Sequence, residues 1–260
     1  MNRHVDRYNK AMAVTAYSNT ATAKHMKKLE RHFVCTICNG KCSNTLVELL
    51  KLSQRFGLKL NLIQTLNSTD TIVELVGLVG NSSPFLEAVE RAHLEAINVT
   101  EVKDGPGETE PYLSEPLSVP ANCSLCIIKP HIIKSSQLPD ILADILGAGF
   151  TIAAIKSLHL TAADGEEIFD AYKEVTSRYS DFLAHVSSGI SVALMITGFQ
   201  EATVSELRKL CGPPLPDIAR ALRPNTLRAR YGVDSSMNAV HCSDICEYGK
   251  PECCFIIQFY

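Results

Sequence analysis

Residues 123–149 read CSLCIIKPHIIKSSQLPDILADILGAG, an apolar run followed by a helical pattern. The run Cys123–Ile128 ends at Lys129-Pro130, and proline disfavours helical backbone in the residue before it, so we expect a buried strand. The helix that follows shows an amphipathic stripe of Leu138, Ile141, Leu142, Ile145 and Leu146. Glycines at positions 147 and 149 end the helical pattern. This stretch therefore predicts a strand packed against its following helix.

The pattern C-terminal to this stretch completes a β-α-β-β-α-β order. Further strands are expected at 150–160, 192–196 and 254–259, with helical segments in 163–185 and 204–210. This order predicts a ferredoxin-like split βαβ unit in the α+β class.

The N-terminal half repeats the same order. Strands are expected at 32–38, 58–66, 72–79 and 97–102, with one helix ending near Gly57 and a second beginning at Pro84. The repeat indicates an internal duplication, hence two ferredoxin-like βαββαβ domains in tandem. The predicted organisation is a basic N-terminal arm at 1–31, a first domain at 32–104, a Pro- and Gly-rich linker at 105–120 and a second domain at 121–260.

The composition narrows the possible classes of protein. With 260 residues, 46% of them hydrophobic and 20% charged, the chain can bury a core. A net charge of -3 gives no general reason to bind nucleic acid. No apolar run approaches the roughly 18 residues of a membrane span, and the N-terminus lacks an apolar signal core. We expect a cytoplasmic protein with no membrane or nucleic-acid partner.

Ten cysteines raise the alternatives of a disulfide scaffold or a zinc site. Cys35/Cys38 and Cys123/Cys126 have the C-x-x-C spacing of zinc ligands, but both pairs fall in predicted strands. Residues three apart on a strand point to opposite faces, so the two thiols of a pair cannot share a metal there. Reduced thiols and no protein-held metal are the expectation.

Candidate chemistry concentrates after residue 207. A basic cluster with one acid among it, Asp217, suits a phosphorylated ligand, because guanidinium groups pair with phosphate oxygens. The alternative interpretation of this cluster is a solvated basic face. His241 follows the cluster, and Glu252 is close enough in sequence to reach its ring, so a neutral imidazole nucleophile is a candidate. The cluster comprises Arg208, Lys209, Arg220, Arg223, Arg228 and Arg230.

Four motifs together resemble the nucleoside diphosphate kinase family over residues 121–260. They are Ile127-Ile128-Lys129-Pro130-His131, Cys211-Gly212-Pro213, Arg223-Pro224-Asn225-Thr226-Leu227-Arg228 and Asn238-Ala239-Val240-His241-Cys242-Ser243-Asp244. Their wording is most similar to the two-domain axonemal nucleoside diphosphate kinase 7 group. From this resemblance we expect the usual N-terminal DM10 module of that group to be missing, with residues 5–17 as its remnant.

The resemblance implies a transferase that passes the γ-phosphoryl group of ATP, or another nucleoside triphosphate, to a nucleoside diphosphate through a phosphohistidine on His241. Ser243 and Glu252 match the pair that orients the histidine. Magnesium is implied as cofactor, held through the nucleotide phosphates rather than by protein ligands. The positions implied for nucleotide binding are Lys129, Tyr172, Tyr179 (or Phe182), Arg208, Pro214, Arg228 and Asn238.

The sequence also departs from the family pattern. Pro214 stands where a threonine is usual, which removes a hydroxyl and a backbone donor. Asn225 replaces a glycine of the loop used for trimer contacts, which argues against a conventional hexamer. The segment after Tyr172 is shorter than usual. The first domain lacks the lysine, the arginine loop and the histidine motif, so we expect a degenerate, non-catalytic domain that serves packing and partner contact.

A second hypothesis is a structural protein that binds tubulin or other axonemal proteins, with weak or no kinase activity. The resemblance implies a cytoskeletal location for it, in the axoneme of a cilium or flagellum. The degenerate first domain, the basic arm and Asn225 motivate it. The two hypotheses are compatible with each other.

Overall fold

The computed structural model describes residues 30–37, 42–65, 70–78, 81–94, 97–102, 118–174 and 178–259. Nearly all of the predicted basic arm and linker lies outside these residues. Within the described residues, no helix is long and apolar enough to cross a membrane.

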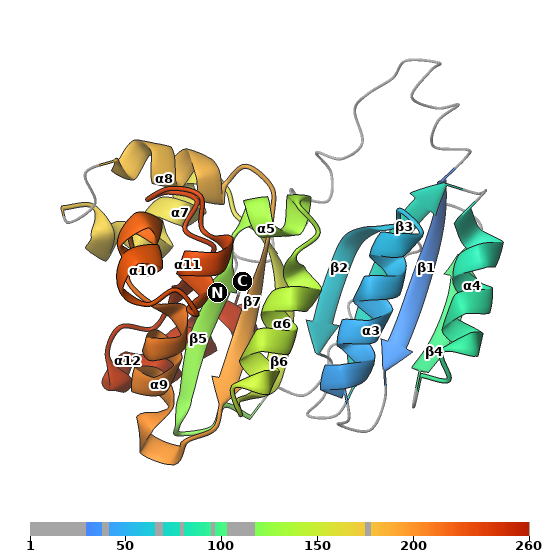
Figure 1. Ribbon diagram of the computed structural model, residues 1–260, viewed down its shortest axis with the longest axis horizontal. Helices are drawn as coiled ribbons and strands as arrows, with labels where there is room; N and C mark the ends of the chain where they lie inside the picture. Colours follow the sequence, from blue (N-terminus) through green and yellow to red (C-terminus); the bar gives the residue numbers. More distant parts are fainter. Residues whose placement is uncertain are drawn as a thin grey trace, which may run out of the picture.

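The first unit is a four-stranded antiparallel sheet with two helices, in the predicted order (Figure 1). Its strands lie in the order β4-β1-β3-β2. Gly57, which follows the first helix, has a φ of 69°, the left-handed conformation that glycine adopts without strain. The elements are β1(Glu30–Ile37), α3(Cys42–Arg55), β2(Lys59–Thr65), β3(Thr71–Leu78), α4(Ser82–Arg91) and β4(Ile97–Val102).

The second unit repeats this arrangement and adds further helices. Its strands lie in the equivalent order, β8-β5-β7-β6, and all its neighbouring pairs are antiparallel. Its elements are β5(Cys123–Ile128), α5(Pro130–Lys134), α6(Leu138–Gly147), β6(Thr151–His159), α7(Ala162–Phe169), η2(Asp170–Tyr172), α8(Tyr179–Val186), β7(Ile190–Thr197), η3(Gln200–Ala202), α9(Thr203–Cys211), α10(Pro216–Leu222), α11(Leu227–Tyr231), β8(Val240–Cys242), α12(Cys246–Cys253) and η4(Cys254–Phe259).

The two units share one eight-stranded sheet, which was not predicted from the sequence. Strand β2 pairs antiparallel with β6, where Gln64 lies opposite Lys156. The Ile155 amide donates to Thr65 Oγ1 at 3.0 Å, and the Ile63 amide donates to Ser157 Oγ at 3.4 Å. Each unit contributes its second strand, so equivalent strands meet at the junction, as in a two-fold related pair.

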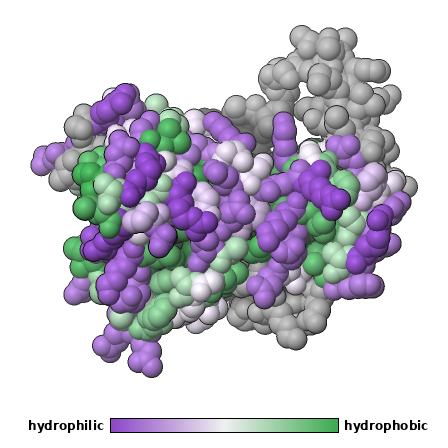
Figure 2. Space-filling view, in the orientation of Figure 1, coloured by the Kyte–Doolittle hydropathy of each residue, from purple (hydrophilic) through white to green (hydrophobic). Residues whose placement is uncertain are grey.

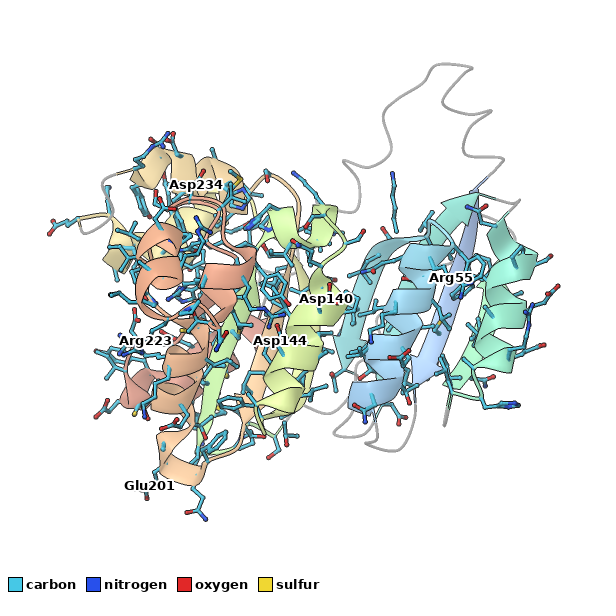
Figure 3. The ribbon with its side chains drawn as sticks, in the orientation of Figure 1. Arg55, Asp140, Asp144, Glu201, Arg223 and Asp234 are labelled. Carbon is cyan, nitrogen blue, oxygen red and sulfur yellow. The ribbon has the colours of Figure 1, made fainter. Side chains whose placement is uncertain are left out.

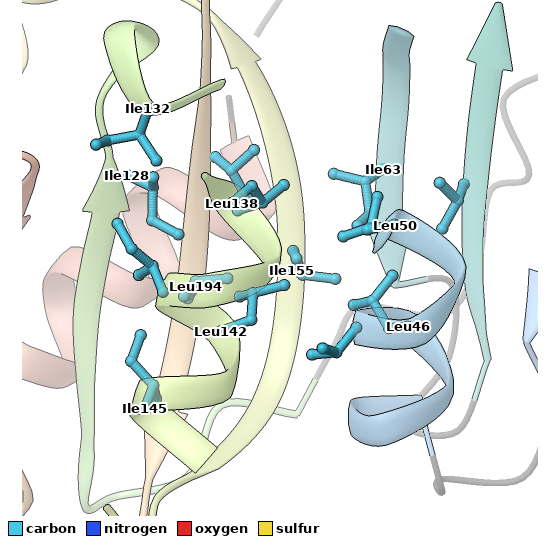
Figure 4. Packing of buried hydrophobic residues seen from close by; sticks show 14 of the residues in the cluster. Leu46, Leu50, Ile63, Ile128, Ile132, Leu138, Leu142, Ile145, Ile155 and Leu194 are labelled. Carbon is cyan, nitrogen blue, oxygen red and sulfur yellow. The ribbon is translucent and has the colours of Figure 1, made fainter. Parts of the chain in front are cut away.

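The helices beside this junction also pack together. Helices α3 and α6, the first long helix of each unit, lie side by side on one face of the sheet. One continuous cluster contains buried residues from both units, so the first unit is part of the core that lies on this face of the sheet. Figure 4 shows the side chains that meet there, among them Leu46, Leu50, Ile63, Leu138, Leu142 and Ile155.

The predicted last strand at 254–259 is wrong. This segment is a π-helix, η4, and the fourth strand of the second unit is instead β8. Cys253, Ile256 and Ile257 are buried while Phe255 is exposed, which is helical spacing rather than strand alternation. Their side chains pack against the sheet on the face opposite α6, so apolar content misled the strand assignment.

The alternation of β5 separates the two faces of the sheet. Cys126 and Ile128 belong to the cluster beside α6, whereas Cys123, Leu125 and Ile127 belong to a second cluster under α7, α8 and η4. The Cys123 and Cys126 thiols therefore lie on opposite faces, as the spacing argument predicts.

Apolar side chains also gather on the surface. Leu215, Ile218 and Leu222 of the α10 segment are 44%, 44% and 72% exposed, and apolar surface is visible over α10 and α12 at the left of Figure 2. These three exposed apolar residues lie close in sequence to Asn225. The prediction against a conventional hexamer stays a prediction.

Candidate functional site

A tight turn places His241 at the edge of the sheet. Ala239 has a φ of 71°, and the Val240 amide donates to the Asn238 carbonyl at 3.0 Å, which closes a γ-turn. A left-handed alanine costs on the order of 1–3 kcal/mol, and such strain concentrates at functional sites. The turn leads directly into β8, where His241 lies opposite Ile127 of β5.

The His241 ring lies among aromatic side chains. Its centroid is 5.1 Å from that of Phe169 and 5.4 Å from that of Tyr172, with both pairs of rings nearly perpendicular. Burial, Arg228 and Lys129 together lower its pKa to about 3, against a smaller opposing effect of Asp244. The imidazole is therefore neutral at neutral pH, the state in which a ring nitrogen is nucleophilic.

Ser243 and Glu252, which the resemblance pairs, are joined by a hydrogen bond. Ser243 is fully buried, and its Oγ accepts a 3.0 Å hydrogen bond from the Leu125 amide. Burial raises the pKa of the Glu252 carboxyl, although hydrogen bonding with the Ser243 hydroxyl opposes the shift. Glu252 Oε2 is buried without a hydrogen-bond partner among the described residues. The two residues therefore form a pair, and their effect on the His241 ring stays a prediction.

Lys129 is 2% exposed although it carries an ammonium group. Its Nζ donates to the Ser236 carbonyl at 2.8 Å and lies 4.5 Å from the centre of the Phe182 ring, a cation–π contact. Burial and Arg228 lower its pKa to about 7, while Asp234 opposes them. No carboxylate forms an ion pair with it in the described part of the chain, so an anionic ligand would supply the missing charge.

The guanidinium of Arg228 is fixed by main-chain carbonyls. Its Nη1 donates to Gly212 at 2.7 Å, and its Nε and Nη2 donate to Val240 at 3.2 and 3.1 Å. These bonds tie the end of α9 and strand β8 to one cation beside the nucleophile. Gly212 has a φ of 80°, and a Cβ there would meet Thr226 Oγ1 at 2.3 Å.

Arg208 belongs to a different set of contacts. Its Nη1 donates to the Asp244 carbonyl at 2.7 Å, and its Nε lies 3.6 Å from Asp244 Oδ1. Tyr172 donates its hydroxyl hydrogen to Oδ2 of the same carboxylate. Asp244, which sequence reasoning left without a role, thus holds Arg208 and Tyr172 near His241.

Asn238 and Pro214 are joined by a hydrogen bond. The Asn238 Nδ2 donates to the Pro214 carbonyl at 2.9 Å, while Asn238 Oδ1 is buried without a partner among the described residues. An unpaired buried amide oxygen is costly unless a ligand donates to it. Pro214 itself is exposed, and its proline ring offers no donor.

The aromatic side chains of α8 lie next to Lys129. Tyr179 and Phe182 are stacked with an interplanar angle of 21° and centroids 6.2 Å apart. The edge of Phe182 meets Phe169, which itself contacts His241. The predicted base-contacting residues therefore lie in the aromatic cluster that includes the nucleophile candidate.

The other candidate cations lie away from this centre. Arg230 pairs with Asp144 of α6, and Arg220 pairs with Asp217 and donates to the Gly232 carbonyl. Figure 3 labels Arg223, which is exposed at the end of α10. The basic cluster of the sequence thus divides into two cations near His241, Arg208 and Arg228, and others that lie away from it.

Comparison with known proteins assigns the family. Residues 122–259, more than half of the chain, match the family model described as nucleoside diphosphate kinase. The chain belongs to the nucleoside diphosphate kinase family.

Two relatives and one solved structure illustrate how far the similarity reaches. The chain is 44% identical over 131 residues to nucleoside diphosphate kinase homolog 7 of Rattus norvegicus, covering 50% of this chain and 33% of the relative. It is 32% identical over 135 residues to the nucleoside diphosphate kinase of Aquifex aeolicus, covering 52% of this chain and 93% of that one. A crystal structure of the Aquifex aeolicus enzyme aligns with 54% of this chain and 99% of its own at 30% identity and a TM-score of 0.49. The chain thus spans about a third of the length of its homolog 7 relative.

Proposed function

We propose that residues 121–260 form a nucleoside diphosphate kinase that works through a phosphohistidine on His241. A ring nitrogen attacks the γ-phosphorus of a nucleoside triphosphate, and the bond from phosphorus to the bridging oxygen breaks as the nucleoside diphosphate leaves. A second nucleoside diphosphate then attacks the phosphohistidine and takes the phosphoryl group. The observation that carries this proposal is that the His241 imidazole is neutral and lies close enough to Lys129 and Arg228 for both cations to lower its pKa.

The cations bind and orient the phosphates. Lys129 and Arg228 stabilise the negative charge of the transferring group, and Arg208 extends this positive region. Asn238 Oδ1 accepts from a sugar hydroxyl, which gives the unpaired oxygen a partner. Tyr172, Tyr179 and Phe182 supply aromatic surface for the base.

Ser243 and Glu252 orient the nucleophile. The buried Ser243 fixes the carboxylate, and Glu252 has a free oxygen that can accept from the ring N–H as positive charge develops on His241. Such a bond would hold the ring in one tautomer and keep the attacking nitrogen unprotonated.

Magnesium would be held by the phosphates of the nucleotide rather than by the chain. The carboxylate of Asp244 is engaged by Tyr172 and Arg208, and that of Glu252 by Ser243, so the acids near His241 already have donors from the chain itself. The donor set fits a cation held through phosphate oxygens, with no protein ligand. When bound, magnesium neutralises phosphate charge.

The test is labelling with ATP that carries radioactive γ-phosphorus. We expect protein-bound label that is acid-labile and alkali-stable, absent from His241→Ala and present in His159→Ala, whose histidine is exposed at the end of β6. Equal labelling of His241→Ala would overturn the assignment.

Binding to tubulin or axonemal proteins, and a cytoskeletal or ciliary location, stay predictions. The folded first unit offers a surface for partner contact, but the site chemistry favours phosphotransfer as the primary proposal.

A further inference from the structure

Two histidines other than His241 are joined by a hydrogen bond beside the site. His131 lies on α5 and His185 lies in the last turn of α8. Their Nδ1 and Nε2 atoms are 2.9 Å apart, and the ring centroids are 4.9 Å apart. The bond joins segments 54 residues apart in sequence, so it is a tertiary contact between two helices.

A second contact between the same segments reinforces this one. Lys134, also on α5, donates from Nζ to the Ser188 carbonyl at 2.9 Å and to Ser188 Oγ at 3.2 Å, just beyond the end of α8. Helix α5 follows Lys129 directly, and Lys129 is its N-cap residue. The C-terminal end of α8 is therefore tied to the segment that carries the phosphate lysine.

The N-terminal half of α8 carries the aromatic side chains of the site. Phe182 covers the Lys129 ammonium at 4.5 Å, and Tyr179 stacks on Phe182. A shift of α8 would displace both rings relative to Lys129 while leaving β8, and with it His241, in place.

Burial and the nearby positive charges keep both rings of the pair neutral at neutral pH. Burial, the partner ring and Lys129 lower the pKa of His131 to about 4; burial, Lys129 and Lys134 do the same for His185. Asp234 opposes both shifts from the loop before β8, beside α8 in Figure 3. Its carboxylate is itself held by the Ser236 and Met237 amides, at 2.8 and 2.7 Å. One neutral ring donates and the other accepts.

We propose that the His131–His185 hydrogen bond is a positioning contact that fixes α8 over Lys129 and so sets the affinity of the site for the nucleoside part of its substrate. The proposal rests on the proposed function. In this role the pair acts through the position of α8 and not by contact with the reacting atoms. Its loss should weaken binding of a nucleotide and spare binding of a phosphate chain that has no base.

The test compares two ligands, ADP and tripolyphosphate, each with magnesium, by titration calorimetry on the full chain. We expect His185→Ala to weaken ADP binding by about tenfold, the equivalent of one ordinary hydrogen bond, and to change tripolyphosphate binding by less than about twofold. His185→Gln, which keeps a donor and an acceptor at this place, should recover most of the ADP affinity.

A double-mutant cycle distinguishes the loss of the His131–His185 hydrogen bond from a general loss of stability. If the two rings act through one bond, His131→Ala with His185→Ala should weaken ADP binding no further than either change alone. Equal loss for both ligands, additive effects, or an unchanged ADP affinity would overturn the proposal. Failure of His241 to become phosphorylated would overturn the proposed function instead, since the binding measurements do not depend on phosphotransfer.

Discussion

The Nζ atom of Lys129 lies 4.5 Å from the centre of the Phe182 ring, and its hydrogen bond goes to a main-chain carbonyl rather than to a carboxylate. No carboxylate of the described residues forms an ion pair with this ammonium, and burial together with Arg228 lowers the pKa of Lys129 to about 7, although Asp234 opposes the shift. The residue is thus half-charged near neutral pH until an anion arrives.

Nucleotide binding should therefore take up a proton. At about pH 8 most Lys129 side chains are neutral in the free protein, and bound phosphates raise the pKa so that the ammonium forms. We expect uptake approaching one proton per ADP, measured by calorimetry in two buffers of different ionisation enthalpy. Lys129→Arg, which stays charged, should show little uptake; the same uptake in both proteins would contradict this prediction.

Gly212 should not tolerate a side chain. It has a φ of 80°, and an added Cβ would meet Thr226 Oγ1 at 2.3 Å and Thr226 Cβ at 2.6 Å. Gly212→Ala is expected to lower the free energy of unfolding by about 2–5 kcal/mol and to weaken nucleotide binding, because the Gly212 carbonyl holds Arg228. Urea unfolding measures the first effect. The control is Gly147→Ala, where no atom lies within 4 Å of the new methyl group; comparable losses in both variants would refute the steric argument.

Acid should destabilise the fold through its half-buried histidines. The pKa of His241 is about 3 in the folded protein, whereas an unfolded histidine titrates near about 6.5. Between these values the unfolded chain binds more protons, so the free energy of unfolding falls as pH decreases from about 6.5 toward 3. We expect His241→Asn to flatten this dependence in urea unfolding, and His159→Asn, at an exposed position, to leave it unchanged. An identical slope in His241→Asn and the native protein would exclude His241 as a contributor.

The junction between the two units depends on side-chain as well as main-chain bonds. Thr65 Oγ1 accepts from the Ile155 amide, so Thr65→Val leaves that amide without its partner. The expected cost is about 1–2 kcal/mol in free energy of unfolding, with faster hydrogen exchange at the Ile155 amide. Thr36→Val, on strand β1 away from the junction, serves as the matched control. Unchanged exchange at Ile155 would show that the bond contributes nothing.

Local patterns in the sequence predicted most elements of both units. Strand β4 and strand β5 have the predicted bounds, and the helical stripe of α6 faces the core as expected. The strand prediction for residues 254–259 failed because Ile256 and Ile257 fit an apolar strand as well as the buried face of a helix. The shared sheet could not be foreseen, since pairing of β2 with β6 depends on two edges that meet only in three dimensions.

The site was predictable in its residue types more than in its contacts. The motifs indicated His241, Lys129 and Arg228, which the structure places within electrostatic reach of one another. The γ-turn at Ala239 and the pairing of His131 with His185 had no local signal, because one alanine and two histidines show nothing unusual in sequence. Tertiary geometry supplies both features.

A chase experiment tests the central claim most directly. The protein is labelled with radioactive ATP, freed of nucleotide and mixed with unlabelled GDP and magnesium. Label that leaves the protein and appears in GTP is the predicted result, because a phosphohistidine on His241 is poised to transfer to a nucleoside diphosphate. Label that stays on the protein, or that is released only as inorganic phosphate, would contradict the account.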